Sequence, residues 1–293
     1  MSQPAKRPVS MIGNQESTLG ELISNINSIS SLPLIYNRLN DAINHPRTSV
    51  KDIAQIISED PGLTARILKL ANSTMYGFSG VDSISRAVTL IGTRELRDLA
   101  LATSVLNNFP SIPDDLLNME KYRQHSLACG AYARNIAVYL REPSIEKFFV
   151  AGILHDIGHL VMCAIVPDSV RLICDRSEDN AVCRVENDVL GFDHAAVGGE
   201  LLTSWKIPRN ISELVSFHHS PADCVQYPTG ATIVHLAELT CLALGYCPDM
   251  EINIPPLDEI AYEKLKFPNG AIETIVQQTE GQLAEVFTIL LES

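Results

Sequence analysis

The sequence predicts an all-α fold, and three observations support this assignment. Apolar residues recur at helical spacing through most of the chain. No window shows the sustained two-residue alternation between turn dipeptides that is typical of strands and hairpins. Residues suited to helix caps stand directly before several of the apolar periodic runs. The 293 residues are enough to bury a core as one large domain or as two smaller ones.

The first half of the chain predicts a series of helices, most of them short, each with its own start signal. Capping-box residues and helix-opening prolines supply these signals. The expected starts of the first four helices are Thr18 with Glu21, Pro33, Ser49 with Asp52, and Asp60 with Pro61. Gly77 stands where the fourth helix should stop. A short helix over 84–91 and a longer one capped by Thr93 should follow.

The run from Phe109 to Pro113 contains two prolines and breaks the helical pattern, so we place a boundary near residue 115. The expected organisation is a flexible tail at 1–16, an N-terminal helical half at 17–115, a helical core at 116–245 and a C-terminal helical extension at 246–293. Beyond the boundary, the expected helices cover 116–140, 144–165, one or two shorter segments to 190, then 194–205, 208–218, 229–245, 257–264 and 267–291.

Cysteine usage and the N-terminal sequence predict a cytoplasmic protein. The seven cysteines are odd in number, lack a C-x-x-C pair and mostly lie among apolar residues, as reduced core thiols do. The start, MSQPAKRPVS, has no apolar run behind its basic residues and is no secretory signal. The segment 148–166 approaches the length of a membrane span, but His155, Asp156 and His159 at its centre favour a buried helix of a soluble core.

The charge balance excludes two classes of partner. Formal net charge is -13, with acidic residues spread along the chain. Because an acidic surface repels nucleic acid and anionic membranes alike, we expect neither as a partner.

Histidines and one aspartate in the second half carry the residue types of a metal site. They are His125, the adjacent pair His155 and Asp156, His194, and the pair His218 and His219. Imidazole and carboxylate groups are ligands that divalent ions prefer when several converge on one point. Neighbours on a helix diverge by about 100°, so the His155–Asp156 pair needs a helix edge or a metal shared between facing helices. His159 shares a face with His155, whereas His45 and His235 are interpreted as structural.

The order of these motifs resembles a known family. The segments HSLACGAYA, FFVAGILHDIGHL, GFDHAAVGGELLTSWKIP and VSFHHSP resemble the HD superfamily of metal-dependent phosphohydrolases. Upstream, SLPLIYNRLNDAI, VKDIAQIISEDPGLTARILKLANSTMYG and ISRAVTLIGTRELRDLAL narrow the resemblance to HDOD, the HD-related output domain of bacterial signalling proteins. The resemblance covers residues 32–242. It implies a multi-helix HD-like bundle, with an N-terminal helical subdomain before the HD-like core.

The resemblance also implies a set of metal ligands. In catalytic HD relatives these match His125, His155, Asp156 and a late aspartate, which is Glu238 here. In the two-metal HD-GYP branch, further ligands match His194, His218 and His219. The implied cofactor is one or two divalent ions from among iron, manganese, zinc, magnesium and nickel.

Two departures from the catalytic pattern bear on activity. The late carboxylate is one methylene longer, and His159 replaces a lysine that often follows the HDIG motif in the HD-GYP branch. The HD-GYP loop motif is also missing after the paired histidines, where Ser220 and Pro221 follow. We therefore do not expect a second-messenger phosphodiesterase of that type.

Three functional hypotheses remain open. The first is a stand-alone, noncatalytic HDOD signalling or regulatory module that acts on a signalling protein partner. The second is an HD-type phosphohydrolase acting on a nucleotide or other phosphate ester, with Asp156 and His159 as candidate catalytic residues. The third is ligand sensing without chemistry. An open coordination position on a bound metal would separate the first two, because catalysis requires one. The sequence leaves the oligomeric state open.

Overall fold

Helices form all the regular secondary structure in the part of the chain that the computed structural model describes. That part comprises residues 19, 22, 33–108, 112–177, 180–250, 253–268 and 270–291. Within it the N-terminal helices are α2 (Leu34–Asn44), α3 (Val50–Ser58), α4 (Pro61–Ala71), α5 (Ile84–Ile91) and α6 (Thr93–Asn108). The all-α prediction is therefore confirmed.

The later helices follow the predicted order closely. They are α7 (Met119–Tyr139), α8 (Glu146–Leu154), α9 (Ile157–Ile165), α10 (Pro167–Arg176), α11 (Val182–Leu190), α12 (His194–Ser204), α13 (Arg209–Ser216), α14 (Pro228–Ala243), α15 (Glu259–Leu265) and α16 (Ala271–Leu291), with a short 3-10 turn at Pro221–Asp223. The expected tail, the Thr18 capping box and the break at 109–111 lie outside the described residues. The boundary near residue 115 stays a prediction.

Local hydrogen bonds explain where the N-terminal helices begin. Ser49 and Asp52 form the predicted capping box of α3, and Asp60 accepts the Leu63 amide at 2.9 Å to cap α4. Pro33 stands at the cap position before α2 rather than in its first turn. Thr93 is the first residue of α6 rather than its cap.

Two of these differences have clear causes. The Gly92 carbonyl accepts the amide of Leu96, so Gly92 occupies the cap position of α6. Helix α4 ends at Ala71, well before Gly77, because the Asn72 side chain forms hydrogen bonds in both directions with the backbone of Val81. These bonds turn the chain immediately after the helix.

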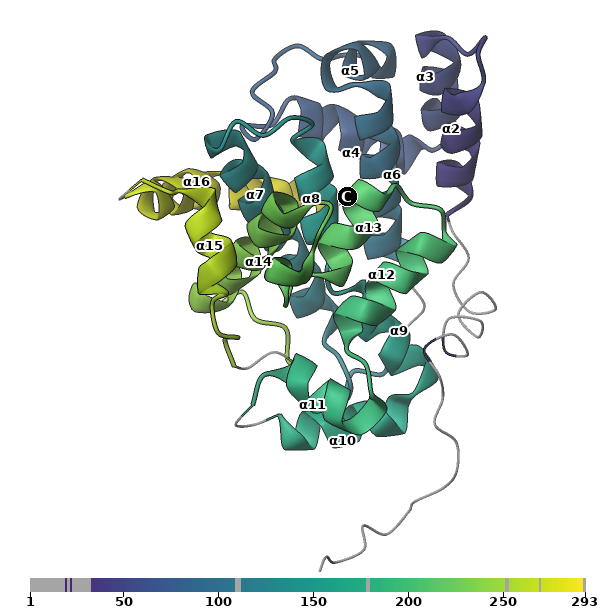
Figure 1. Ribbon diagram of the computed structural model, residues 1–293. Coiled ribbons are helices and arrows are strands. Elements are labelled where there is room, and N and C mark those ends of the chain that lie inside the picture. Colours follow the sequence, from purple (N-terminus) through teal and green to yellow (C-terminus); the bar gives the residue numbers. More distant parts are fainter. Residues whose placement is uncertain are drawn as a thin grey trace, which may run out of the picture.

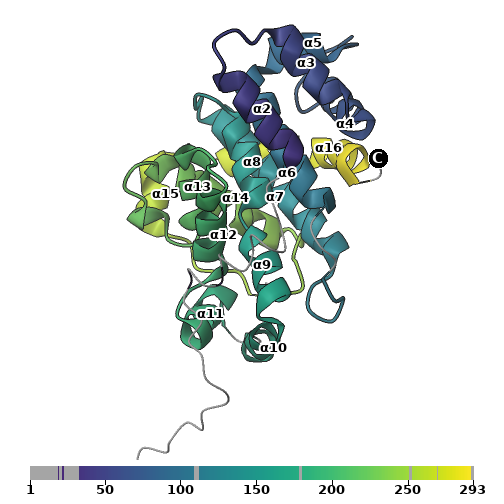
Figure 2. The same ribbon diagram turned by 90° about the vertical axis from the view of Figure 1, so that its right-hand side faces the viewer.

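The helices form a bundle with two distinct ends. Figures 1 and 2 place α2 to α5 at one end, α10 and α11 at the opposite end, and α7, α8, α9, α12, α13 and α14 between them. Helix α8 packs on α6, α7, α13 and α14, which makes it the central helix of the core. The C-terminal helix α16 packs on α7 and on α4.

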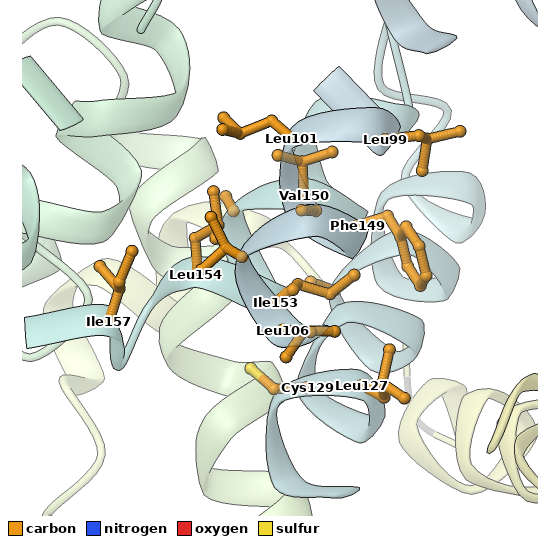
Figure 3. Packing of buried hydrophobic residues seen from close by; sticks show 14 of the residues in the cluster. Leu99, Leu101, Leu106, Leu127, Cys129, Phe149, Val150, Ile153, Leu154 and Ile157 are labelled. Atoms are coloured by element: carbon orange, nitrogen blue, oxygen red, sulfur yellow. The ribbon is translucent and has the colours of Figure 1, made fainter. Parts of the chain in front are cut away.

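Helix α8 is apolar on every side because it is surrounded. Figure 3 shows its residues Phe149 and Ile153 beside Leu127 of α7 and Leu106 of α6, all of them buried. Burying each such side chain contributes about 1.5 to 3 kcal/mol. Close approach of α7 and α8 requires a glycine, since a Cβ on Gly152 would lie 2.7 Å from the Cα of Gly130.

The predicted helix over 144–165 is corrected to two helices, α8 and α9. The break falls at His155 and Asp156, where Asp156 leaves helical geometry with φ -95° and ψ 13°. The chain thus bends at the HDIG motif, which lets α9 continue in a new direction toward α12.

The apolar segment Glu146–Ile165 is the one candidate membrane span among the described residues, and 89% of its most apolar window is buried. That environment is typical of a core helix in a soluble protein. All seven cysteines are free, and Cys129, Cys163, Cys224 and Cys241 are buried.

Candidate metal centre

The predicted metal ligands come from distant parts of the chain and meet in one place. His125 lies on α7, His155 and Asp156 between α8 and α9, His194 at the start of α12, His218 and His219 just after α13, and Glu238 on α14. The side chains of all these residues except His219 are 0% exposed, and that of His219 is 7% exposed.

Asp156 lies at the middle of this cluster. Its Oδ1 atom is 3.2 Å from Nε2 of His155, 3.4 Å from Nε2 of His194 and 3.8 Å from Nε2 of His218. Its Oδ2 atom is 3.4 Å from Nε2 of His125. One carboxylate therefore faces four imidazole nitrogens, each from a different part of the fold.

His219 and Glu238 extend the cluster on one side. Nε2 of His219 lies 2.8 Å from Nε2 of His194, and Nδ1 of His219 lies 3.6 Å from Oε1 of Glu238. Oε2 of Glu238 is 4.0 Å from Nε2 of His218. Two ligand groups result, one of His125, His155 and Asp156 and one of His194, His218 and His219, each with its ligand atoms within 4.8 Å of one another.

The bend between α8 and α9 explains how neighbouring residues converge. On a continuous helix His155 and Asp156 would point about 100° apart. Because the helix breaks at Asp156, both side chains enter the same space. Gly158 follows the bend, and a Cβ there would lie 2.0 Å from the carbonyl oxygen of His194. Glycine at this position lets the start of α12 reach the bend.

Backbone carbonyls orient three of the imidazoles. Nδ1 of His125 lies 2.5 Å from the Tyr246 carbonyl, Nδ1 of His155 lies 2.8 Å from the Gly152 carbonyl, and Nδ1 of His218 lies 2.7 Å from the Val215 carbonyl. A carbonyl only accepts, so each Nδ1 carries the proton and each Nε2 presents a lone pair to the centre. This is the tautomer that ligates metal.

The same arrangement leaves a demand for positive charge. The Nε2 atoms of His125 and His155 face each other at 3.2 Å, which places two lone pairs in opposition. Among the described residues, neither oxygen of Asp156 and no Nε2 partner of His218 completes a hydrogen bond. Burying such groups without a partner is costly, and a divalent ion would satisfy them together. The residues fit a metal ion.

Glu186 on α11 belongs to the centre, although it was not among the predicted residues. Its Oε2 atom accepts the Nδ1–H of His194 at 2.7 Å and the backbone N–H of the same residue at 2.9 Å. Its Oε1 atom lies 3.3 Å from Nδ1 of His159. The available signal was a glutamate beside the apolar positions Val182 and Val185 of a helix, where a buried charge needs a partner.

His159 flanks the cluster. Its ring stacks on that of His194 with centroids 3.8 Å apart, and it can share a ligand group with Asp156 and His194. Its predicted catalytic role, like that of Asp156, stays a prediction.

The carboxylates of the centre are held ionised. Burial opposes ionisation of Asp156, but the neighbouring His155 and His125 outweigh it and hold its pKa well below the usual range. Burial likewise opposes ionisation of Glu186, but His194 and His159 lower its pKa.

The imidazoles divide into two kinds. Burial disfavours the charged rings of His155 and His194, yet Asp156 raises the pKa of His155 well above its usual value and Glu186 raises that of His194. For His218 and His219, burial and the neighbouring histidines act together and hold each pKa well below the usual value. The centre therefore has neutral imidazole ligands beside anionic carboxylates.

The two histidines interpreted as structural lie outside the cluster. His45 is exposed at the end of α2. His235 on α14 is buried, with Nδ1 2.7 Å from the His218 carbonyl, while its Nε2 accepts the Asp258 amide at 3.1 Å. Both ring nitrogens of His235 are engaged by backbone groups, as expected for a structural residue.

Comparison with known proteins gives this geometry a family. The model of the HDOD domain matches residues 29–221. The chain belongs to the HDOD domain family. All the predicted ligands except Glu238 lie within the matched region, and α14, α15 and α16 lie beyond it.

Solved structures share the fold over nearly the whole chain. A candidate phosphohydrolase from Shewanella amazonensis SB2B is 25% identical with a TM-score of 0.72, covering 92% of this chain and 97% of its own. An HDOD domain protein of unknown function from Geobacter sulfurreducens is 22% identical with a TM-score of 0.71, covering 94% and 99%. A candidate signal transduction protein from Marinobacter aquaeolei VT8 is 20% identical with a TM-score of 0.67, covering 96% and 61%.

A longer relative comes from Treponema pallidum (strain Nichols). This uncharacterised protein is 27% identical over 222 residues, which are 73% of the present chain. The match spans 42% of the length of that relative.

Proposed function

We propose that this HDOD protein is a regulatory module that holds divalent metal in a closed centre and passes a signal through protein contacts, without turnover. The observation that carries the proposal is that the ligand set is both complete and sealed. His125, His155, Asp156, His194, His218 and Glu238 converge while their side chains are 0% exposed.

Closure supports a regulatory role over catalysis. A catalytic metal keeps a coordination position for water or substrate, and substrate pockets are concave spaces that reach solvent. Here only the edge of His219 reaches solvent among the predicted ligands. A phosphate ester would need part of the bundle to open before it could meet Asp156.

Within the proposed centre, each residue has a physical task. Asp156 supplies the central carboxylate, and His125, His155 and His218 present Nε2 because carbonyls hold their Nδ1 protons. Glu186 orients His194 in the same way. The bound ion would neutralise the buried carboxylates and, given an open position, would lower the pKa of bound water.

The setting proposed for this module is the bacterial cytoplasm, with a signalling protein as its partner. The burial of the apolar segment Glu146–Ile165 and the free cysteines support an intracellular setting. The family assignment supports a role in signalling.

A second candidate function is a metal-dependent phosphohydrolase acting on a nucleotide or other phosphate ester. The retention of the complete ligand set favours it, with Glu238 within 3.6 Å of His219 in place of the family aspartate. The likeness to the candidate phosphohydrolase from Shewanella amazonensis points the same way. Asp156 and His159 would be its catalytic residues.

Elemental analysis tests the proposal. Protein purified without added metal should carry one or two equivalents of iron, manganese or zinc, and the His155→Ala and Asp156→Ala variants should lose them. The His45→Ala variant is the matched control, because His45 is exposed and remote from the centre. A wild-type protein that neither carries nor takes up metal would overturn the proposal.

A substrate screen then separates the two functions. The metal-loaded protein is assayed with p-nitrophenyl phosphate, bis(p-nitrophenyl) phosphate and a panel of nucleotides. We expect no turnover above the metal-free control. Hydrolysis that requires metal and is lost in Asp156→Ala would replace the regulatory proposal with the enzyme.

A further inference from the structure

The acceptor that orients His125 lies beyond the part of the chain that matches the family. It is the carbonyl of Tyr246, 2.5 Å from Nδ1 of His125, in the segment that follows α14. Two hydrogen bonds of a Schellman turn place this segment, from the Tyr246 amide to the Cys241 carbonyl at 3.0 Å and from the Gly245 amide to the Leu242 carbonyl at 3.1 Å. The backbone of Tyr246 thus continues directly from the helix that carries Glu238.

The side chain of Tyr246 is held by α16. Its hydroxyl donates to Oε2 of Glu280 at 3.0 Å, and its ring packs edge-on against Phe287 with centroids 6.1 Å apart. Burial and the nearby Glu280 raise the pKa of Tyr246 to about 12, so the phenol stays protonated and able to donate. The position of the Tyr246 carbonyl therefore depends on a residue of the C-terminal helix.

The same glutamate also holds the helix that carries His125. Oε1 of Glu280 accepts the hydroxyl of Tyr132 at 2.7 Å. Tyr132 lies two turns after His125 on α7 and shares its face. Glu280 thus joins the two segments that supply the donor and the acceptor of the His125 hydrogen bond.

Helix α16 has other anchors that do not involve Glu280. Asn135 of α7 donates to the side chains of Thr279 and Gln282 at 2.9 and 2.8 Å. Glu285 accepts the amide and the hydroxyl of Thr74, in the N-terminal half, at 2.9 and 2.6 Å. Removing the Glu280 carboxylate should therefore leave α16 docked, and Glu285 provides a matched control on the same helix.

We propose that Glu280 is a positioning residue of the metal centre, acting on His125 through Tyr246 and Tyr132. This inference rests on the proposed function, because it requires that the centre bind metal. It adds that docking of α16 and metal binding favour each other, since a coupling between two equilibria is reciprocal. Because α16 also contacts Thr74, metal occupancy would be linked to the packing of the N-terminal half.

The test compares zinc affinity and cobalt spectra among variants of the full chain. Glu280→Ala and Tyr246→Phe should each weaken Zn²⁺ binding about 3- to 10-fold, as expected for the loss of one hydrogen bond behind a ligand. The exposure of Glu280 places the effect in this modest range. The double variant should bind no more weakly than either single variant, because both remove the same contact.

Two further variants separate positioning from general stability. Glu285→Ala should lower the melting temperature yet leave the zinc affinity and the Co²⁺ d–d spectrum at wild-type values. Glu280→Ala should change that spectrum, because the orientation of one ligand changes. Glu280→Gln keeps one acceptor oxygen, so its affinity should lie between those of the wild type and Glu280→Ala.

The outcomes distinguish this inference from the proposed function. A wild-type protein that binds neither Zn²⁺ nor Co²⁺ overturns both. If the wild type binds and His155→Ala does not, the metal centre stands. Glu280→Ala with wild-type affinity and spectrum, or Glu285→Ala with an equal loss of affinity, would then overturn the positioning role alone.

Discussion

Oε2 of Glu186 accepts hydrogen bonds from both the backbone amide and Nδ1 of His194, at 2.9 and 2.7 Å. One carboxylate oxygen thereby fixes where α12 begins and which way its first side chain turns. The other oxygen lies 3.3 Å from His159, whose ring stacks on His194. Glu186 thus sets the orientation of His194 without occupying a ligand position of its own.

Replacing Glu186 with glutamine should weaken metal binding more than it weakens the fold. The amide is a poorer acceptor than the carboxylate, so the Nε2 atom of His194 loses both orientation and basicity. We expect a loss of zinc affinity of about 10- to 100-fold, as is typical when the partner of a histidine ligand is changed. Isothermal titration and a competing chelator measure the affinity, and urea unfolding measures the stability.

Glu200→Gln provides the matched control, because Glu200 is exposed on α12. It should leave zinc affinity unchanged. If Glu186→Gln also binds zinc as tightly as the wild type, the two hydrogen bonds do not serve the metal centre.

Periodicity and caps were sufficient to predict most of the fold. Each cap depends on residues three positions apart, as in Ser49 with Asp52, and such local contacts can be recognised in the sequence. The bend at Asp156 could not be predicted, because the segment from Phe148 to Val166 is continuously apolar. Its cause is tertiary, since α9 turns to meet α12 at Gly158.

The site shows the same division between local and distant signals. The sequence predicted the residues of the metal centre through motifs, and the fold brings them together. Glu186 and Tyr246 escaped prediction because their roles depend on what they contact. Glu186 is one of many glutamates in an acidic chain, and Tyr246 acts through its backbone carbonyl, which carries no sequence signature.

Adding a methyl group at Gly158 should disrupt the bend. The new Cβ would lie 2.0 Å from the backbone oxygen of His194, and backbone atoms cannot move aside as a flexible side chain can. We expect Gly158→Ala to lower the free energy of unfolding by about 3 kcal/mol, the upper part of the range for overpacking. Thermal and urea unfolding of metal-free protein measure this loss.

Gly281→Ala is the control for Gly158→Ala. Gly281 lies within α16, and no atom stands within 4 Å of the position a Cβ would take. Alanine there should raise the free energy of unfolding by about 0.5 to 1 kcal/mol, because it restricts the unfolded chain and favours the helix. Equal effects at the two glycines would contradict the close contact between α9 and α12.

His235 should prove structural, in contrast to His218. Burial lowers the pKa of His235, so its ring is neutral and bridges the His218 carbonyl and the Asp258 amide. His235→Ala leaves two backbone groups without these partners, which should cost about 2 to 4 kcal/mol of stability. Its metal content, measured by elemental analysis, should match that of the wild type.

His218→Ala should show the opposite pattern, with metal lost. The exposed His45→Ala should change neither quantity. Loss of metal from His235→Ala, with the protein still folded by circular dichroism, would show that His235 belongs to the centre.

The last prediction concerns Asp98, in the N-terminal half and outside the metal cluster. Burial raises its pKa to about 6, even though Arg97 lies beside it and donates to Oδ1 at 2.7 Å. The unfolded value is about 3.9. A carboxyl whose folded-state pKa is raised contributes stability at low pH, and this contribution is lost as pH rises through about 6.

Asp98→Asn removes that titration. Relative to this variant, the wild type should lose about 2 kcal/mol of stability between about pH 4.5 and pH 7.5. The comparison is made by urea unfolding with a chelator present, so that metal does not contribute, and the histidines titrate alike in both proteins. Asp41→Asn, which changes an exposed carboxylate on α2, should follow the wild type at every pH. A constant difference between wild type and Asp98→Asn across this range would mean that Asp98 titrates as an ordinary carboxylate, and that Arg97 fully offsets the cost of burying its charge.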